Sequence, residues 1–294
     1  MCIDRKPVCG ILAFIIVLLA MPLGHALMVL TQVLLGPGGQ FFGAVGLGML
    51  GLAALVVAQR GQTEMVQTFL GLFAGVFLWT GFVEFSFVYY AGHLSVLPEV
   101  INGEIVTKPE YLILPSSIGL LITILAYFFF NGQIRCPFLV WWRRALRLKI
   151  LFTSNHKTKN YANITAIETI CILWTFYTLL LLAYDPAIFG DRHPFTYIVL
   201  AGSLLWSGYL VTKLLRLNRT ASAVRYAIPT VIIFWNAVEI LGRWNFFKEI
   251  WIEPMNYWLE ISLILAAFAG VLVLALASQK SQASNPAAPH RLDT

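Results

Sequence analysis

Residues 11–35 read "ILAFIIVLLAMPLGHALMVLTQVLL", a run without a single Lys, Arg, Asp or Glu. A helix of about 20 apolar residues crosses a hydrocarbon core about 30 Å thick, so this stretch predicts a transmembrane helix. It also resembles the apolar core of a signal peptide. However, the run is too long for one and lacks a small-x-small cleavage site, so we interpret it as a retained span.

The rest of the chain has the same character. Of its 294 residues, 59% are apolar and only 12% are charged, which leaves too little polar surface to cover a water-soluble protein of this size. The composition predicts an all-α polytopic membrane protein whose main surroundings are lipid. Similar apolar runs place about eight spans, at 11–35, 41–58, 65–91, 111–131, 163–184, 194–215, 222–243 and 256–277.

Lys and Arg are concentrated in two of the predicted loops. The connector after the fourth span carries seven of them and no acid, and the loop after the sixth span is also basic, whereas the opposite loops are acidic or balanced. The positive-inside rule then places both termini and the basic loops in the cytoplasm, and we expect a cytoplasmic (inner) membrane protein. The net charge of +6 reflects this topology and anionic lipid rather than nucleic acid.

An even number of spans permits an internal duplication, because four helices begin and end on the same side of the membrane. Superposing the two halves pairs Val83-Glu84 with Val238-Glu239, 155 positions later. Such a 4+4 repeat predicts two parallel four-helix bundles, with the two glutamates facing each other or in equivalent half-sites. The chain then divides into a first four-helix membrane unit (1–131), a basic cytoplasmic connector (132–161), a second four-helix membrane unit (162–277) and a disordered cytoplasmic tail (278–294).

The connector predicts an amphipathic helix lying on the inner leaflet. Pro137 suits a first helical turn, and the residues that follow combine headgroup-level tryptophans with arginines that reach lipid phosphates. The residues expected to bind anionic lipid are Trp141, Trp142, Arg143, Arg144 and Arg147. RNA binding is the alternative, and the neighbouring spans favour lipid over it.

Ionisable residues inside spans are costly, by about 2.5–3.5 kcal/mol on insertion scales, and usually face a cavity or a partner. Here the candidates for a ligand or proton site are His25, Glu84, Glu239 and Arg243. All four are expected in the outer part of the membrane. One outer-leaflet cluster is therefore predicted to hold them.

Two interpretations of the acids remain open. Glu239 and Arg243 are four residues apart on one helix face, so they are expected to pair directly as a structural ion pair. In the functional alternative Arg243 holds Glu239 as a fixed charge, while Glu84 has no cation on its own helix and acts as the proton carrier.

His25 has three interpretations: a helix-packing histidine, a group that contacts a proton or a quinone, and a haem ligand. Haem ligation is disfavoured because the other four histidines fall in loops or the tail. A metal site built on His93 with nearby glutamates matches no defined spacing, so no metal is predicted. Because the sequence contains no P-loop, HExxH, GxSxG or CxxC motif, it leaves enzymatic activity undecided.

Three functions fit these observations. The first is a carrier or channel-like protein for protons, cations or a small solute. The second is a quinone-binding anchor subunit of a respiratory electron-transfer complex, with quinone as its cofactor. Eight spans in two bundles would be similar to the polysulfide-reductase-type anchor subunits, although their sequence motifs are absent. The third is a scaffold without a ligand. The aromatic segment "GRWNFFKEIWIEPMNYW" (242–258) either lies along the outer interface or binds a periplasmic or membrane protein partner.

Overall fold

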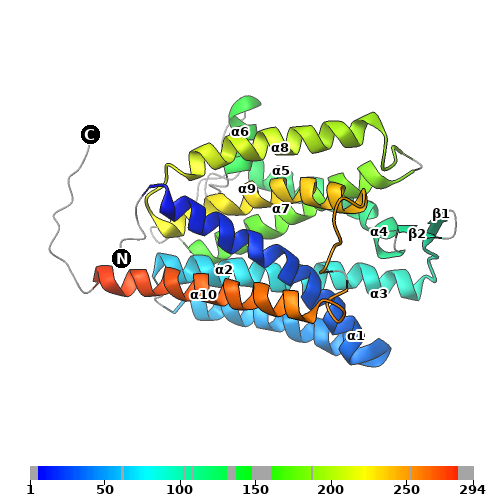
Figure 1. The fold of residues 1–294 in the computed structure, drawn as a ribbon, viewed down its shortest axis with the longest axis horizontal. Helices are drawn as coiled ribbons and strands as arrows, with labels where there is room; N and C mark the ends of the chain where they lie inside the picture. Colours follow the sequence, from blue (N-terminus) through cyan, green and yellow to red (C-terminus); the bar gives the residue numbers. More distant parts are fainter. Residues whose placement is uncertain are drawn as a thin grey trace.

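The computed structural model describes residues 6–60, 63–101, 104–107, 109–130, 137–147, 160–186, 188–251 and 253–283. Within these ranges the chain is almost entirely helical (Figure 1). The exceptions are two short antiparallel strands, β1 (Glu99–Ile101) and β2 (Glu104–Thr107), which form a hairpin. The helices are α1 (Val8–Ala58), α2 (Glu64–Leu78), η1 (Trp79–Glu84), α3 (Phe85–His93), α4 (Pro109–Ile113), η2 (Leu114–Ser117), α5 (Ile118–Phe130), α6 (Pro137–Ala145), α7 (Tyr161–Tyr184), α8 (Pro194–Leu214), α9 (Thr220–Arg243) and α10 (Trp258–Ala283).

Seven helical segments among the described residues are long and apolar enough to cross a membrane, and they match the first seven predicted spans. The protein is therefore a multi-pass helical membrane protein. The eighth predicted span coincides with α10, whose described apolar part, Trp258–Val273, is shorter than the other seven. A total of eight spans stays a prediction. The seven segments are Val8–Gly36, Gly39–Ala58, Glu64–His93, Pro109–Tyr127, Tyr161–Tyr184, Pro194–Leu214 and Thr220–Arg243.

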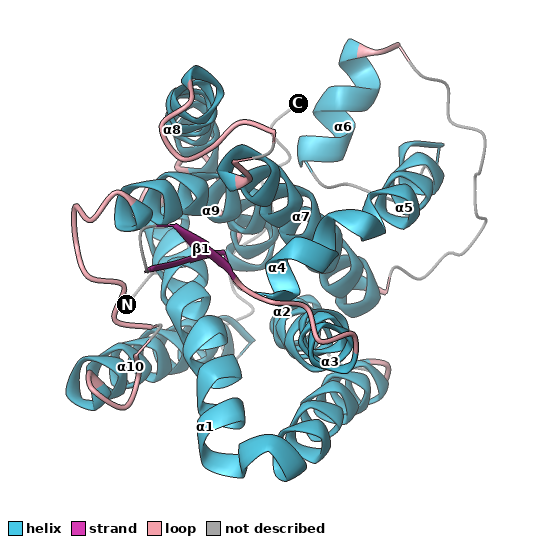
Figure 2. Cartoon of the chain, turned by 90° about the vertical axis from the view of Figure 1, so that its right-hand side faces the viewer, coloured by secondary structure: helices cyan, strands magenta, loops and turns pink. Residues whose placement is uncertain are grey.

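The helix α1 contains the first two spans, joined by a break at Gly36. This residue has φ 63° and ψ −176°, a backbone conformation that glycine adopts readily because it lacks a Cβ atom. Past the break the chain doubles back, so that Gly43 lies against the side chains of Thr31 and Leu35. The turn is visible where α1 reverses direction in Figure 2.

Four segments form the centre of the molecule: the first span of α1, α2, α7 and α9 (Figure 2). Glycine permits the close approach of α2 to α7, because a Cβ atom on Gly71 would overlap the backbone of Ala162 and one on Gly75 would lie 2.8 Å from Cβ of Thr169. On the other side, Phe14 of α1 packs edge-on against Phe234 of α9, with ring centroids 5.9 Å apart.

The central helices thus come two from each half of the chain. The extensive contacts of α2 with α7 and of α1 with α9 join the halves, as extensively as α1 contacts α2 and α8 contacts α9 within them. The arrangement as two four-helix bundles stays a prediction. The 4+4 repeat itself stays a prediction.

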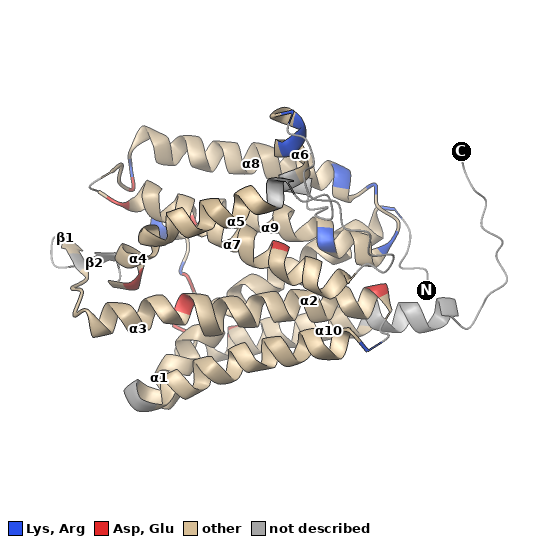
Figure 3. Ribbon diagram, turned by 180° about the vertical axis from the view of Figure 1, so that it is seen from behind, with Lys and Arg blue, Asp and Glu red and all other residues tan. Residues whose placement is uncertain are grey.

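Basic residues gather at one end of the helix bundle, here named the basic end (Figure 3). They lie on α6 and around the turn between α8 and α9, where α1 also begins and the described part of α10 ends (Figures 1 and 3). The connector contains the helix α6 within the predicted segment, and its position at the membrane interface stays a prediction. Lys149, Lys157 and Lys159 of the same connector lie outside the described residues. The cytoplasmic orientation of this end stays a prediction.

Candidate functional site

The third span is not a regular α-helix. Between α2 and α3 it contains η1, a π-helix that ends at Glu84. Such segments contain an extra residue and are frequent at functional sites. Gly81 explains why η1 is accommodated here: a Cβ atom would lie 2.5 Å from both the carbonyl oxygen of Ala44 and the amide nitrogen of Gly48. The second span of α1 therefore packs directly on the backbone of η1.

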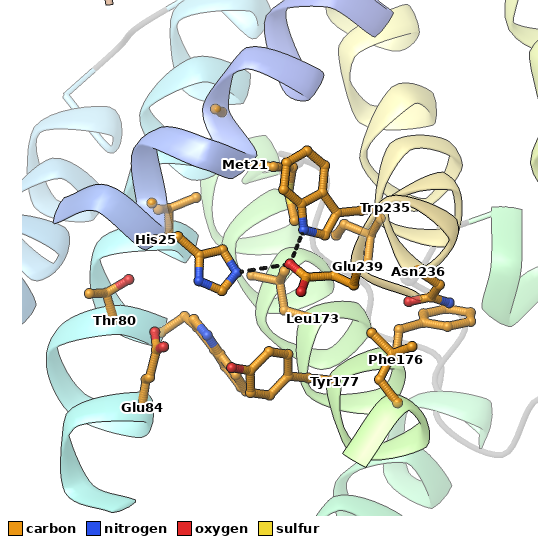
Figure 4. A pocket seen from close by; sticks show the side chains of 16 residues that line it. Met21, His25, Thr80, Glu84, Leu173, Phe176, Tyr177, Trp235, Asn236 and Glu239 are labelled. Carbon is orange, nitrogen blue, oxygen red and sulfur yellow. Dashed lines mark hydrogen bonds and ion pairs between the residues drawn. The ribbon is translucent and has the colours of Figure 1, made fainter. Parts of the chain in front are cut away.

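The side chain of Glu239 lies between α9 and α1. One of its carboxylate oxygens is 3.4 Å from Nε2 of His25, within ion-pair distance, and accepts a hydrogen bond of 2.6 Å from Nε1 of Trp235 one turn earlier on α9 (Figure 4). The His25 ring in turn lies 6.4 Å from that of Tyr177 on α7, centroid to centroid. Groups on α1 and α9 thus fix the position of this carboxylate, and α7 packs against the histidine.

A small cavity, here named the deep cavity, lies beside these groups. Its volume is about 60 Å³, room for a few water molecules. His25, Glu84 and Glu239 all line it (Figure 4), together with rings that include Trp79 and Tyr177. The structure thus brings three of the four predicted site residues together from three spans far apart in the sequence. Their role in binding a ligand or proton stays a prediction.

The deep cavity adjoins a larger space, here named the wide chamber, of about 1200 Å³. His25, Glu84, Tyr177 and Glu239 line both. The other walls of the wide chamber come from α1, α3 and α4, from the ends of α7 and α9, and from the segment between α9 and α10, toward the end opposite the basic end. A space of this size can admit a small organic molecule.

Arg243 also lines the wide chamber, but it does not pair with Glu239 as expected. Its Nε donates to Oδ1 of Asp191 at 2.5 Å, and its guanidinium lies over the ring of Tyr184, 4.5 Å from the centroid. Asp191 belongs to the loop between α7 and α8, and its backbone oxygen accepts a hydrogen bond from Trp244. Arg243 is therefore paired with Asp191 of a neighbouring loop, and not with Glu239 one turn earlier on its own helix.

The aromatic residues of the site were not among the predicted site residues. Residues between α9 and α10, among them Phe246, Phe247 and Trp251, line the wide chamber rather than only a membrane interface. Trp251 is buried against Trp235 with ring centroids 4.9 Å apart. The aromatic enrichment of this segment was the available signal. It is also typical of residues at the headgroup level, so the sequence alone could not separate the two.

Two side chains of the wide chamber have unsatisfied donors. The hydroxyl of Tyr184 and Nε1 of Trp251 are buried without a hydrogen-bond partner in the part of the chain that the structure describes, and both residues are only 7% exposed. Buried donors are normally satisfied. Both residues line the chamber, although these two donor atoms are themselves occluded from it.

The other histidines in the described ranges, His93 and His193, line neither the deep cavity nor the wide chamber. His93 stacks on Tyr89, and His193 caps the first turn of α8 by accepting from the amide of Phe195. Among the residues described, no group of three or more His, Cys, Asp or Glu side chains is arranged to hold a metal ion. No family model, curated protein or solved structure matches this chain.

Proposed function

We propose that this protein is a membrane carrier or channel-like protein for protons, cations or a small cationic solute, with His25, Glu84 and Glu239 as its binding groups. The observation that carries the proposal is that a histidine and two carboxylates from three spans line one cavity within the bundle. Such groups are costly in lipid unless they face a cavity or a partner, and they mark ion and proton pathways in membrane proteins.

The wide chamber gives this site access from one side. Because the chamber lies opposite the basic end, the positive-inside rule orients it toward the outside of an inner membrane, with both termini in the cytoplasm. Glu84 and Glu239 then lie in the outer part of the membrane and meet a solute arriving from outside. The orientation and the membrane are parts of this proposal.

Toward the basic end the bundle is closed, which supports alternating access. The glycine contacts of α2 with α7 leave little space between these helices. Beyond them, Arg225 of α9 donates to Glu64 of α2 at 2.6 Å and to the hydroxyl of Thr68 at 2.7 Å, and lies over the ring of Tyr161 on α7. A chamber open at one end and closed by a breakable ion pair at the other is the arrangement that a carrier needs in one of its two states.

The internal repeat would account for the symmetry of the site. The helices that carry Glu84 and Glu239 are the third spans of the two proposed halves, and both glutamates line the deep cavity. Two related half-sites that meet at a central axis are found in duplicated transporters.

The test is transport by the full-length protein in liposomes. Uptake of protons and of monovalent cations should be measured for the wild type, Glu84→Gln, Glu239→Gln and the control Glu260→Gln, whose side chain is exposed on α10. We expect a decrease of at least tenfold for the first two variants and no change for the control. Equal flux through all four proteins would refute the proposal.

Quinone binding is the second candidate, and the aromatic rings that line the wide chamber favour it. The imidazole of His25 and the carboxyl of Glu239 are groups that hydrogen-bond to quinone oxygens and exchange their protons. If this function is correct, protein purified from native membranes should carry quinone that His25→Ala removes, while the liposome flux is absent. A scaffold without a ligand would show neither property.

We also propose that α6 binds anionic lipid at the basic end. Trp141 packs on Trp206 of α8 with ring centroids 5.5 Å apart, which holds α6 against the bundle. Arg143 and Arg144 lie in its last turn. Together with Trp142 and Arg147 they have the composition of a helix at an anionic membrane surface. A periplasmic or membrane protein partner stays an untested expectation.

A further inference from the structure

The deep cavity brings together two acidic groups and one basic group (Figure 4). Of the described residues that line it, only Glu84 and Glu239 have a carboxyl group, and only His25 can become cationic. Charges in a small cavity inside a membrane protein are costly unless they are balanced there. The protonation of these three groups is therefore coupled to the charge of any ion that enters the cavity.

His25 is placed to balance the charge of Glu239. Its Nε2 lies 3.4 Å from the carboxylate oxygen that also accepts a hydrogen bond from Trp235. A protonated imidazole at this distance forms a neutral pair with the ionised carboxylate. Arg243 was expected to hold Glu239 but pairs with Asp191 instead. The one basic residue of the deep cavity thus lies beside one of its two acids.

Glu84 is the second acid of the cavity. Its carboxyl interacts electrostatically with Tyr111 and Tyr177, whose side chains are hydrogen-bonded to each other. Neutral hydroxyls can orient an ionised carboxylate, but they do not cancel its charge. Because His25 lies beside Glu239, the positive charge that balances Glu84 within the cavity must come from a proton or from a bound cation.

The wide chamber supplies no excess of positive charge. Its cationic side chains, among the residues described, are Arg243 and Lys248, and the first pairs with Asp191. The other titratable residues that line the chamber, besides the groups named above, are Glu110, Tyr184, Glu249, Glu253 and Tyr257. A cleft with a surplus of acids concentrates cations. The chamber therefore favours the approach of cations to the deep cavity.

We propose that the protein exchanges one proton for one monovalent cation at Glu84. Without a cation in the cavity Glu84 is protonated. An entering cation displaces this proton to water in the wide chamber, so the total charge of the cavity stays constant. A divalent ion would bring one charge too many, and a volume of about 60 Å³ excludes bulky organic cations. This inference rests on the proposed transport function and specifies its ion class and its coupling.

Proton release on cation binding tests the exchange in the purified full-length protein in detergent. Calorimetric titrations with NaCl, KCl and N-methylglucamine chloride, at constant ionic strength and in two buffers of different ionisation enthalpy, count the protons released per bound cation. We expect about one proton for Na⁺ or K⁺ and none for the bulky N-methylglucamine. Binding without proton release, equal release by all three salts, or no binding of either small cation would overturn the proposal.

Carboxamide variants locate the exchanged proton. Glu84→Gln removes the exchanging group, so both binding and release should be lost. Glu239→Gln is expected to bind the cation more weakly but still to release about one proton, because His25 balances the carboxylate that it removes. His93→Gln, at an exposed position outside both spaces, is the control and should match the wild type. Release that persists in Glu84→Gln would contradict the assignment to Glu84.

The liposome assay separates this inference from the proposed function. An inward gradient of Na⁺ or K⁺ should drive protons outward in the wild type. If cation flux depends on Glu84 and Glu239 but moves no protons in exchange, the coupling is wrong and the transport function stands. If neither cations nor protons cross the membrane, the transport function is wrong as well.

Discussion

His25 and Glu239 come from the first and seventh candidate spans, yet their side chains meet 3.4 Å apart inside the bundle. The contact follows from the packing of α1 against α9, which places His25 beside the C-terminal part of α9. The cavity beside this pair is lined by residues of α1 and α9 together with residues of α2, η1 and α7.

Replacing His25 tests whether this pair positions the carboxylate. His25→Phe keeps a ring but removes the Nε2 group beside Glu239, leaving Trp235 as the other partner. We expect KM for cation uptake to rise about three- to tenfold, with a smaller effect on kcat. His25→Gln, which restores an amide donor, should recover part of the loss. If both variants transport normally, His25 has only a packing role.

The contact between α2 and α7 predicts an asymmetric response to alanine substitution. A Cβ atom at Gly71 would overlap the backbone of Ala162, whereas nothing lies within 4 Å of one at Gly202 on α8. We expect Gly71→Ala to destabilise the protein by about 1–3 kcal/mol, since overpacking costs energy where backbones touch. Gly202→Ala should leave Tm unchanged or slightly raised. Comparable Tm values for both variants would show that the two helices are less closely packed.

Weakening the closure at the basic end should expose the interior of the bundle. Arg225→Leu removes the hydrogen bonds to Glu64 and Thr68. In a protein without native cysteines, a cysteine replacing the buried Thr169 should then react at least fivefold faster with a thiol reagent applied from the basic side. Arg216→Leu, at an exposed position of the same end, is the control. Identical labelling in both variants would mean that Arg225 does not take part in the closure.

The lipid role of α6 can be measured by co-purification. An arginine near an anionic surface contributes about 1 kcal/mol, or about fivefold in affinity. The double variant Arg143→Gln and Arg144→Gln should therefore retain at least fivefold less phosphatidylglycerol in detergent. Arg192→Gln, located at the opposite end over the ring of Trp244, should retain the wild-type amount. A loss of lipid in the control alone would place the lipid site elsewhere.

The spans were predictable because the length of an apolar run is set directly by the thickness of the bilayer. The predicted start of the third span, residue 65, differs by one from the observed Glu64. The interleaving of the halves was not predictable, since lipid tails are as apolar as the side chains between helices. Only contacts such as Gly71 with Ala162 show which face of α2 is inward.

The proximity of His25, Glu84 and Glu239 followed from the cost of placing ionisable groups in lipid, which favours their gathering in one place. The partner of Arg243 could not be predicted in this way, because Asp191 lies in a separate loop and the four-residue spacing favoured Glu239 as the partner. The π-helix could not be predicted from the sequence either. The letters "WTGFVE" have no periodicity that distinguishes it from an α-helix.

The extra residue of η1 has a genetic consequence. Loss of one codon between Trp79 and Val83 would still leave a span well above the roughly 20 residues that cross a bilayer. Because η1 already contains one extra residue, this deletion would convert it to a regular α-helix and leave Glu84 directed at the deep cavity. The same deletion within α2 has no extra residue to remove, so every later residue of the helix would turn by about 100° around its axis and Glu84 would face away from the cavity. The third span is therefore expected to tolerate the loss of one codon within η1 but not before it.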